Sequence, residues 1–154
     1  MQDKVFLDTN ILIYCYSIDE KDKQGIALGL LDKYSENSLI SIQVINELSN
    51  ILFKKFKLSS EEVENTILEI DNYIHITNFT ITTQIKALKI KEKYKLQFYD
   101  SLIIATAIEN KCTILYSEDM QNGLIIENVL TIMHLFFKTS KSSFFNSTSL
   151  RYQW

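Results

Sequence analysis

The sequence contains no proline and only three glycines in 154 residues. Because these residues are the strongest breakers of regular structure, their scarcity predicts short connections and many helices. Cys15 and Cys112 lack any paired spacing and no signal peptide is recognisable, so we expect reduced thiols in a cytoplasmic protein. No apolar run approaches the roughly 20 residues that span a bilayer, which favours a protein outside the membrane.

An excess of positive charge is also missing, since 16 Lys and Arg face 19 Asp and Glu and give a formal net charge of −3. This balance argues against a protein that coats nucleic acid electrostatically. It does not exclude an enzyme with an acidic metal site and a local basic rim. The 154 residues fit one domain, and the 46% apolar and 23% charged content is ordinary for a soluble globular chain.

Short apolar segments alternate with helical patterns along most of the chain. We expect strands at 5–7, 38–42, 73–77 and 112–116, and a fifth strand at either 124–126 or 129–132. The alternation predicts an α/β fold with a parallel sheet, helices on both faces and right-handed crossovers.

Two of the expected helices carry apolar residues at helical spacing, which predicts a buried face on each of them. These positions are Ile26, Leu30, Leu31 and Tyr34 in one helix, and Ile81, Ile85 and Leu88 in a later one. From residue 138 onward the composition shifts to Ser, Thr, Asn, Phe and Lys without clear periodicity. We therefore expect a folded domain over 1–137 and a tail over 138–154 that is mobile or bound to a partner.

Four acidic residues adjoin the ends of the expected strands. Asp8 closes the first strand, and Glu47 lies about one turn into the helix after the second strand. Asp100 lies in the first turn of the helix before the fourth strand, and Asp119 lies just beyond that strand. Because functional groups in an open α/β sheet collect beyond the carboxyl ends of the strands, these carboxylates are expected to converge there.

Each of these residues also has an ordinary alternative explanation. Asp8 or Thr9 could simply cap the following helix. Glu47 could be a solvated helix residue, and Asp100 could be a favourable charge at a helix N-terminus. Beyond the fourth strand, Glu118 could serve as the ligand in place of the aspartate that follows it, which would then be a turn residue.

Several carboxylates within a few ångströms of one another cannot all stay ionised unless a positive group joins them. Mg²⁺ prefers oxygen ligands and keeps several of its waters, so an acidic, water-filled cleft suits it. Thr9 and Asn10 beside Asp8, and Ser117 beside Asp119, are suited to orienting carboxylates or waters. Such a site can activate a water and neutralise the charge that develops on a phosphodiester, as metal-dependent nucleases do.

Four segments of the chain resemble the PIN domain family, and most closely its VapC-type toxins of bacterial toxin–antitoxin pairs. The segments are FLDTNIL at 6–12, SIQVINEL at 41–48, FYDSLIIATA at 98–107 and LYSEDMQNG at 115–123. One such segment alone is a weak signal, but four in the same order are specific. The resemblance extends from residue 1 to about residue 132.

The resemblance implies a single PIN-like domain with sheet order 3-2-1-4-5 and an Mg²⁺- or Mn²⁺-dependent endoribonuclease. The family's acidic metal-binding and catalytic quartet corresponds here to Asp8, Glu47, Asp100 and Asp119. Asn10 and Ser117 match supporting positions. The resemblance also implies a homodimer and a small antitoxin partner whose tail covers the cleft. Residues 133–137 and the tail depart from the way relatives usually end.

Three other functions stay open. A PIN module without catalytic activity would only bind RNA or protein. A phosphorylatable receiver-like signalling domain also gathers carboxylates and Mg²⁺, but it needs an Asp at the end of the third strand, where residues 75–78 read HITN. A phosphohydrolase that uses Asp8 as its nucleophile would want a second Asp where Asn10 lies.

Overall fold

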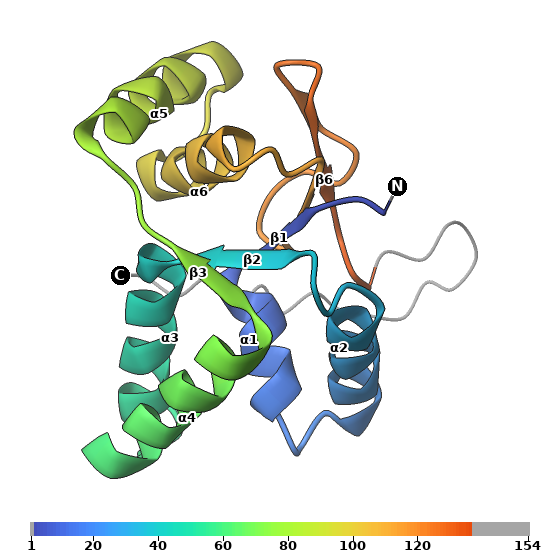
Figure 1. Cartoon of the computed structure of the whole chain (residues 1–154), viewed down its shortest axis with the longest axis vertical. Helices are drawn as coiled ribbons and strands as arrows, with labels where there is room; N and C mark the ends of the chain where they lie inside the picture. Colours follow the sequence, from blue (N-terminus) through green and yellow to red (C-terminus); the bar gives the residue numbers. More distant parts are fainter. Residues whose placement is uncertain (1, 137–154) are drawn as a thin grey trace.

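The structure is a computed structural model that describes residues 2–136. Its centre is a six-stranded sheet in the order β3-β2-β1-β4-β6-β5 (Figure 1). Every neighbouring pair is parallel except β5 and β6, which are antiparallel. The strands are β1 (Val5–Leu7), β2 (Ser38–Ser41), β3 (His75–Thr77), β4 (Ile114–Tyr116), β5 (Ile125–Ile126) and β6 (Leu130–Met133).

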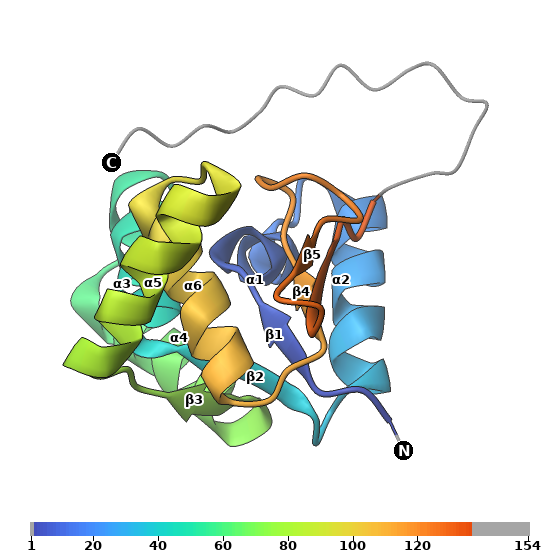
Figure 2. The same cartoon turned by 90° about the horizontal axis from the view of Figure 1, so that it is seen from above.

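Helices cover both faces of the sheet. They are α1 (Thr9–Tyr16), α2 (Lys21–Lys33), α3 (Ile42–Lys54), α4 (Ser60–Tyr73), α5 (Ile81–Tyr94) and α6 (Phe98–Glu109). Figure 1 shows α5 and α6 on one side of the strands and the other four helices on the opposite side. Figure 2, which looks from above, again shows α5 and α6 side by side. The predicted α/β class, with helices on both faces of a mainly parallel sheet, is confirmed.

The first strand lies at the centre of the core. Val5, Phe6 and Leu7 are all fully buried, because β1 is flanked by β2 and β4 and covered on both faces. A parallel strand buried in this way reads as a continuous apolar run rather than an alternating one. The helix α6 is likewise apolar nearly all round, and seven of its residues, from Ser101 to Ala107, are buried.

The far edge of the sheet differs from the predicted order 3-2-1-4-5. Both segments considered for the fifth strand form strands: β6 takes the fifth place, parallel to β4, and β5 adds an antiparallel edge strand beyond it. The reason is a tight turn between them. Glu127 and Asn128 have φ values of 51° and 57°, and Val129 N donates to the Ile126 carbonyl at 3.0 Å. Positive φ at both central residues is the geometry of a hairpin turn.

The prediction for α2 is wrong at one position. Leu30 and Tyr34 are buried as expected, and Leu31 packs partly against the core, but Ile26 is 47% exposed. Ala27 is the buried residue of that turn instead. The helix packs against α1, and the face that it turns inward carries Ala27 and Leu30, so Ile26, one position earlier, points away from it.

The predicted buried face of α5 is wrong altogether. Ile81, Ile85 and Leu88 are 71%, 50% and 54% exposed. The helix packs instead through Thr83, Ala87 and Ile90. The Thr83 hydroxyl donates to Glu109 on α6 at 2.6 Å, so a polar contact helps to set which face of α5 turns inward. Periodicity alone does not reveal such a contact.

The C-terminal residues and the two cysteine thiols were also the subject of predictions. The predicted tail, and residue 137 at the end of the predicted domain, lie outside the described residues. Cys15 and Cys112 are free and buried, and burial raises the pKa of their thiols to about 12 and about 11. None of the helices between residues 2 and 136 combines the length and the apolar character that a membrane span requires.

Candidate active site at the carboxyl edge of the sheet

The candidate site lies where the direction of the sheet order reverses. From β1 the chain builds outward through β2 and β3 on one side, and through β4 and β6 on the other. Ligand sites of open α/β sheets form at such a reversal, beyond the carboxyl ends of the strands. The β1–β4 register pairs Leu7 with Tyr116, so the residues that follow them, Asp8 and Ser117, are neighbours at this edge.

Asp8 is held firmly in place. Its side chain is 3% exposed, and each carboxylate oxygen accepts one hydrogen bond. The donors are the Thr9 backbone N–H, 2.7 Å from Oδ1, and the Ser117 hydroxyl, 2.7 Å from Oδ2. Asp8 is also the N-cap of α1, so the capping explanation holds as well. The same carboxylate therefore begins a helix and faces the site.

Glu47 is joined to Asp8 through Thr9. The Thr9 hydroxyl donates to Glu47 Oε2 at 2.6 Å, while the Thr9 backbone N–H donates to Asp8. Gln43, one turn earlier on α3, donates through Nε2 to Glu47 Oε1 at 2.9 Å. The same nitrogen also lies 3.2 Å from the Tyr99 carbonyl on α6. These bonds tie α1, α3 and α6 together at the edge of the sheet.

Asp119 and Asp100 complete the group from two further elements. The Asp119 backbone N–H donates to the Ser117 hydroxyl at 3.3 Å, which extends the hydrogen-bonded series past β4. The Asp119 side chain keeps an exposed edge at the rim. Asp100 is half-buried in the first turn of α6, where the sequence predicted it. Both side chains approach the site without a hydrogen-bonding side chain to hold them, within residues 2–136.

Raised pKa values show that these carboxylates share one electrostatic environment. The pKa of Asp8 is raised to about 7, mainly by burial and also by the charges of Asp119 and Glu47, against the lowering effect of the Ser117 and Thr9 hydrogen bonds. Burial, followed by the charges of Asp119 and Glu47, raises the pKa of Asp100 to about 6. Partial desolvation, Glu118 and Glu47 raise the pKa of Asp119, which His134 lowers. The structure thus places the predicted quartet within electrostatic range.

The donors at this edge suit a hard divalent cation in their chemistry. They are oxygen atoms of mutually repelling carboxylates, and a cation would relieve that repulsion. Asn10 adds a buried Oδ1 that has no hydrogen-bond partner among residues 2–136. No three His, Cys, Asp or Glu side chains of the described residues are grouped closely enough to hold a metal ion directly. The oxygen donors match the ligand preference of Mg²⁺, which keeps several of its waters, but residues 2–136 do not gather them into a direct metal cage.

Glu118 makes its hydrogen bonds to a different part of the chain from the other predicted site residues. Its Oε1 accepts hydrogen bonds from the backbone N–H groups of Leu135 and Phe136, just after β6. Its Oε2 lies 4.0 Å from His134 Nδ1. The carboxylate thereby fixes the chain that leaves the sheet, while Asp119, not Glu118, adjoins the Ser117 hydroxyl.

Sequence reasoning missed Gln43 as a member of the site. It is 7% exposed, and it connects Glu47 with the backbone of α6. A signal was present, because a Gln four residues before a Glu on a helix lies on the same face. The contact with α6 could not be foreseen, since it depends on how two distant helices meet.

Comparisons with known proteins are consistent with this geometry. The model of a family described as "PIN domain" matches residues 5–121. A toxin–antitoxin complex from Klebsiella pneumoniae matches in fold with a TM-score of 0.67 and 20% identity, over 86% of this chain and 98% of the other. VapBC2 from Rickettsia felis, bound to a DNA fragment from its promoter, matches with a TM-score of 0.63 and 19% identity, over 83% of this chain and 97% of the other.

A third solved structure is the sarcin–ricin loop cleaving toxin VapC20 of Mycobacterium tuberculosis, with a TM-score of 0.61 and 14% identity, over 75% of this chain and 89% of the other. A comparison with curated protein sequences gives no match. At these identities the structural likeness establishes the fold alone.

Proposed function

Because the chain belongs to the PIN domain family, we propose that it is a metal-dependent endoribonuclease and the toxin of a toxin–antitoxin pair. The observation that carries the proposal is the hydrogen-bonded series that runs from Gln43 through Glu47, Thr9, Asp8 and Ser117 to Asp119. It crosses the sheet reversal and gathers carboxylates whose pKa values are raised. Such a site is poised to take up a divalent cation in place of protons.

The proposed roles follow from how each side chain is held. Asp8 and Glu47, whose oxygens accept hydrogen bonds from Thr9, Ser117 and Gln43, provide the fixed side of the cation site. Asp100 and Asp119 provide the side that faces the substrate. Bound there, Mg²⁺ or Mn²⁺ would activate a water and neutralise the charge developing on an RNA phosphodiester. Thr9 and Ser117 keep both fixed carboxylates oriented.

The test measures cleavage of a mixed RNA pool by the purified full chain, once with Mg²⁺ or Mn²⁺ and once with EDTA. The Asp8→Asn variant is measured under the same conditions. We expect cleavage that requires both the cation and Asp8. RNA binding without cleavage would overturn the nuclease proposal in favour of a PIN module that only binds. Metal binding without any interaction with RNA would favour a signalling role.

The toxin role is supported by two of the similar solved structures. One is described as a toxin–antitoxin complex and the other as a cleaving toxin. We propose that a small antitoxin protein binds this chain and blocks the site. Expression of the chain alone is expected to arrest bacterial growth, and Asp100→Asn is expected to abolish the arrest while leaving the fold intact. Arrest that persists in Asp100→Asn would contradict the proposed role of this site.

We also propose that the chain forms a homodimer through the exposed apolar face of α5. Ile81, Ile85 and Leu88 leave this face without cover in the monomer. Light scattering on a sizing column is expected to show a dimer for the wild type and a monomer for Ile85→Glu. Leu68→Glu, at a residue of α4 with 54% exposure, is the matched control and should remain dimeric. A monomeric wild type would exclude this interface.

A further inference from the structure

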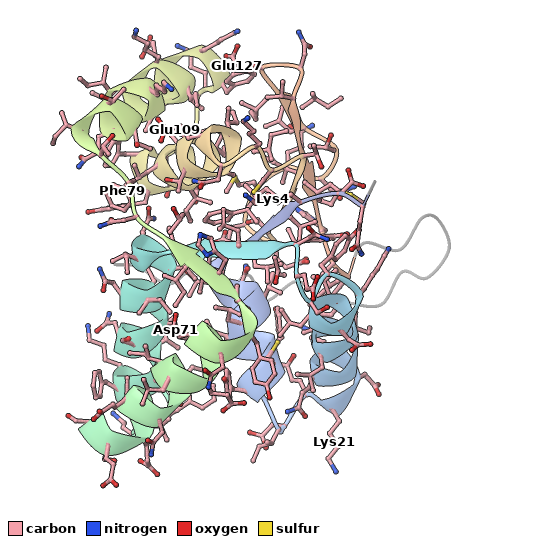
Figure 3. The ribbon with its side chains drawn as sticks, viewed as in Figure 1. Lys4, Lys21, Asp71, Phe79, Glu109 and Glu127 are labelled. Atoms are coloured by element: carbon pink, nitrogen blue, oxygen red, sulfur yellow. The ribbon has the colours of Figure 1, made fainter. Side chains whose placement is uncertain are left out.

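A pocket borders the acidic site at Glu47. Its volume is about 360 Å³, within the range of about 300–1,000 Å³ typical of small-ligand sites. It is lined by Gln43, Asn46, Glu47 and Asn50 of α3, Phe79, and Tyr99 and Leu102 of α6. Phe79 lies on the segment that joins β3 to α5 (Figure 3). Because Glu47 belongs both to the pocket wall and to the acidic site, a ligand in the pocket would adjoin the reacting phosphodiester.

The walls of the pocket combine aromatic and apolar side chains with neutral amides. Tyr99 is 60% exposed, so its ring is accessible to a flat ligand, and Phe79 is half-buried. Among residues 2–136, no Lys or Arg lines the pocket, and the one charged residue that does so is Glu47. This lining would repel a phosphate. It suits an uncharged, planar group with hydrogen-bonding edges.

Three amides in the pocket have hydrogen-bonding capacity to spare. Nε2 of Gln43 is committed to Glu47 and the Tyr99 carbonyl, which fixes the orientation of its amide. Its Oε1 is buried and has no partner among residues 2–136, although buried acceptors are almost always satisfied. The amides of Asn46 and Asn50 form no side-chain hydrogen bond within the same residues. Amides of this kind read the edges of nucleobases.

We infer that this pocket is a subsite for one unpaired nucleobase of the RNA, next to the phosphodiester that is cleaved. The inference rests on the proposed nuclease function and adds to it the source of base selectivity. Tyr99 stacks on the base, while Asn46, Asn50 and Gln43 bind its edge. Single-stranded RNA is recognised in this way, by splaying out a base and stacking it on an aromatic side chain.

The first test measures binding, so that it does not depend on cleavage. Full-length Asp100→Asn protein with Mg²⁺ is titrated against fluorescent single-stranded RNA homopolymers and against an abasic ribose-phosphate strand of equal length. We expect at least one homopolymer to bind more tightly than the abasic strand. Adding Tyr99→Ala should weaken that binding about tenfold, because a stacked base contributes about 1–3 kcal/mol. Binding of the abasic strand should not change.

Two variants control for folding and for tyrosine content. Tyr99→Phe keeps the ring and should retain the preference. Tyr73→Ala removes a tyrosine that is 71% exposed at the end of α4 and does not line the pocket, so it should bind like the parent. Equal binding of homopolymers and abasic strand, or an unchanged preference in Tyr99→Ala, would overturn the inference.

The second test separates this inference from the proposed function. Wild type and Asn50→Ala are compared by sequencing the ends of a cleaved RNA pool. We expect a base preference beside the cut in the wild type and a weaker preference among the cuts that Asn50→Ala makes. Cleavage by both proteins with identical preference would reject the subsite and leave the nuclease standing. An uncut pool together with base-dependent binding would reject the nuclease and leave the subsite standing.

Discussion

The two halves of the acidic site are built differently. Asp8 and Glu47 accept four hydrogen bonds from three neighbouring residues, at 2.6–2.9 Å. Asp100 and Asp119 accept none from side chains within residues 2–136. Strand register and a helix cap fix the first pair, whereas the first turn of α6 and the segment after β4 present the second pair. The difference indicates a preorganised half that defines the site and an adaptable half that closes on its ligands.

The largest expected effect is that of losing a carboxylate from either half. We expect Asp8→Asn and Asp100→Asn each to lower RNA cleavage about 1,000-fold, because each removes charge that holds the cation. The measurement is the single-turnover cleavage rate with saturating Mg²⁺. Asp71→Asn on α4 (Figure 3) is the matched control and should cleave at the wild-type rate. Normal cleavage by Asp100→Asn would show that the adaptable half is dispensable.

The preorganised half should also govern how stability depends on pH. The pKa of Asp8 in the folded state lies near 7 instead of 3.8, so the folded protein binds this proton more tightly than the unfolded chain does. The resulting stabilisation is fully present below about pH 4 and is lost as the pH rises through about 7. In EDTA, Asp8→Asn should therefore become more stable than the wild type as the pH rises, by roughly 2–4 kcal/mol at about pH 8.

Urea unfolding at several pH values measures this difference. Near pH 4 the two proteins should have nearly the same free energy of unfolding. Asp100→Asn is the comparison from the adaptable half and should show the same trend with a smaller size, since the pKa of Asp100 is raised only to about 6. A stability difference between wild type and Asp8→Asn that does not vary with pH would contradict the assigned burial of the Asp8 charge.

The elements that carry the carboxylates of both halves were predictable from the sequence. A buried strand that stops at Asp8, and a second site residue one turn into a helix, follow from local pattern and from the rule for parallel sheets. The edge hairpin escaped prediction because it depends on left-handed backbone at Glu127 and Asn128. Gln43 escaped because its bond to the Tyr99 carbonyl exists only once α3 meets α6. Local patterns were thus readable, and contacts between distant elements were not.

A smaller effect is expected from the hydroxyls that orient the preorganised half. Thr9→Val and Ser117→Ala should each lower cleavage about 10- to 100-fold and raise the Mg²⁺ concentration needed for half-maximal rate. Ser49→Ala is the matched control, because its hydroxyl donates to the Ile45 carbonyl on the same helix that carries Glu47. If both hydroxyl variants cleave normally, the carboxylates are held by burial alone.

The smallest expected effect belongs to Gln43, which bridges the two halves. Its amide holds Glu47 and contacts the backbone next to Asp100. Gln43→Leu should lower cleavage about tenfold, as the loss of one orienting hydrogen bond does. Gln24→Leu, which removes a similar bond to the Cys15 carbonyl outside the site, should have no effect on cleavage.

Double variants can show where Gln43 acts. Thr9 and Gln43 both donate to Glu47, so the combined loss in Thr9→Val with Gln43→Leu should be smaller than the product of the single losses. Ser117 donates to Asp8 instead, so the losses in cleavage rate caused by Ser117→Ala and Gln43→Leu should multiply. If the losses in cleavage rate caused by Gln43→Leu and Thr9→Val instead multiply, Gln43 acts through its contact with α6 and belongs to the adaptable half. The cycle therefore decides on which side of the site the bridging residue exerts its effect.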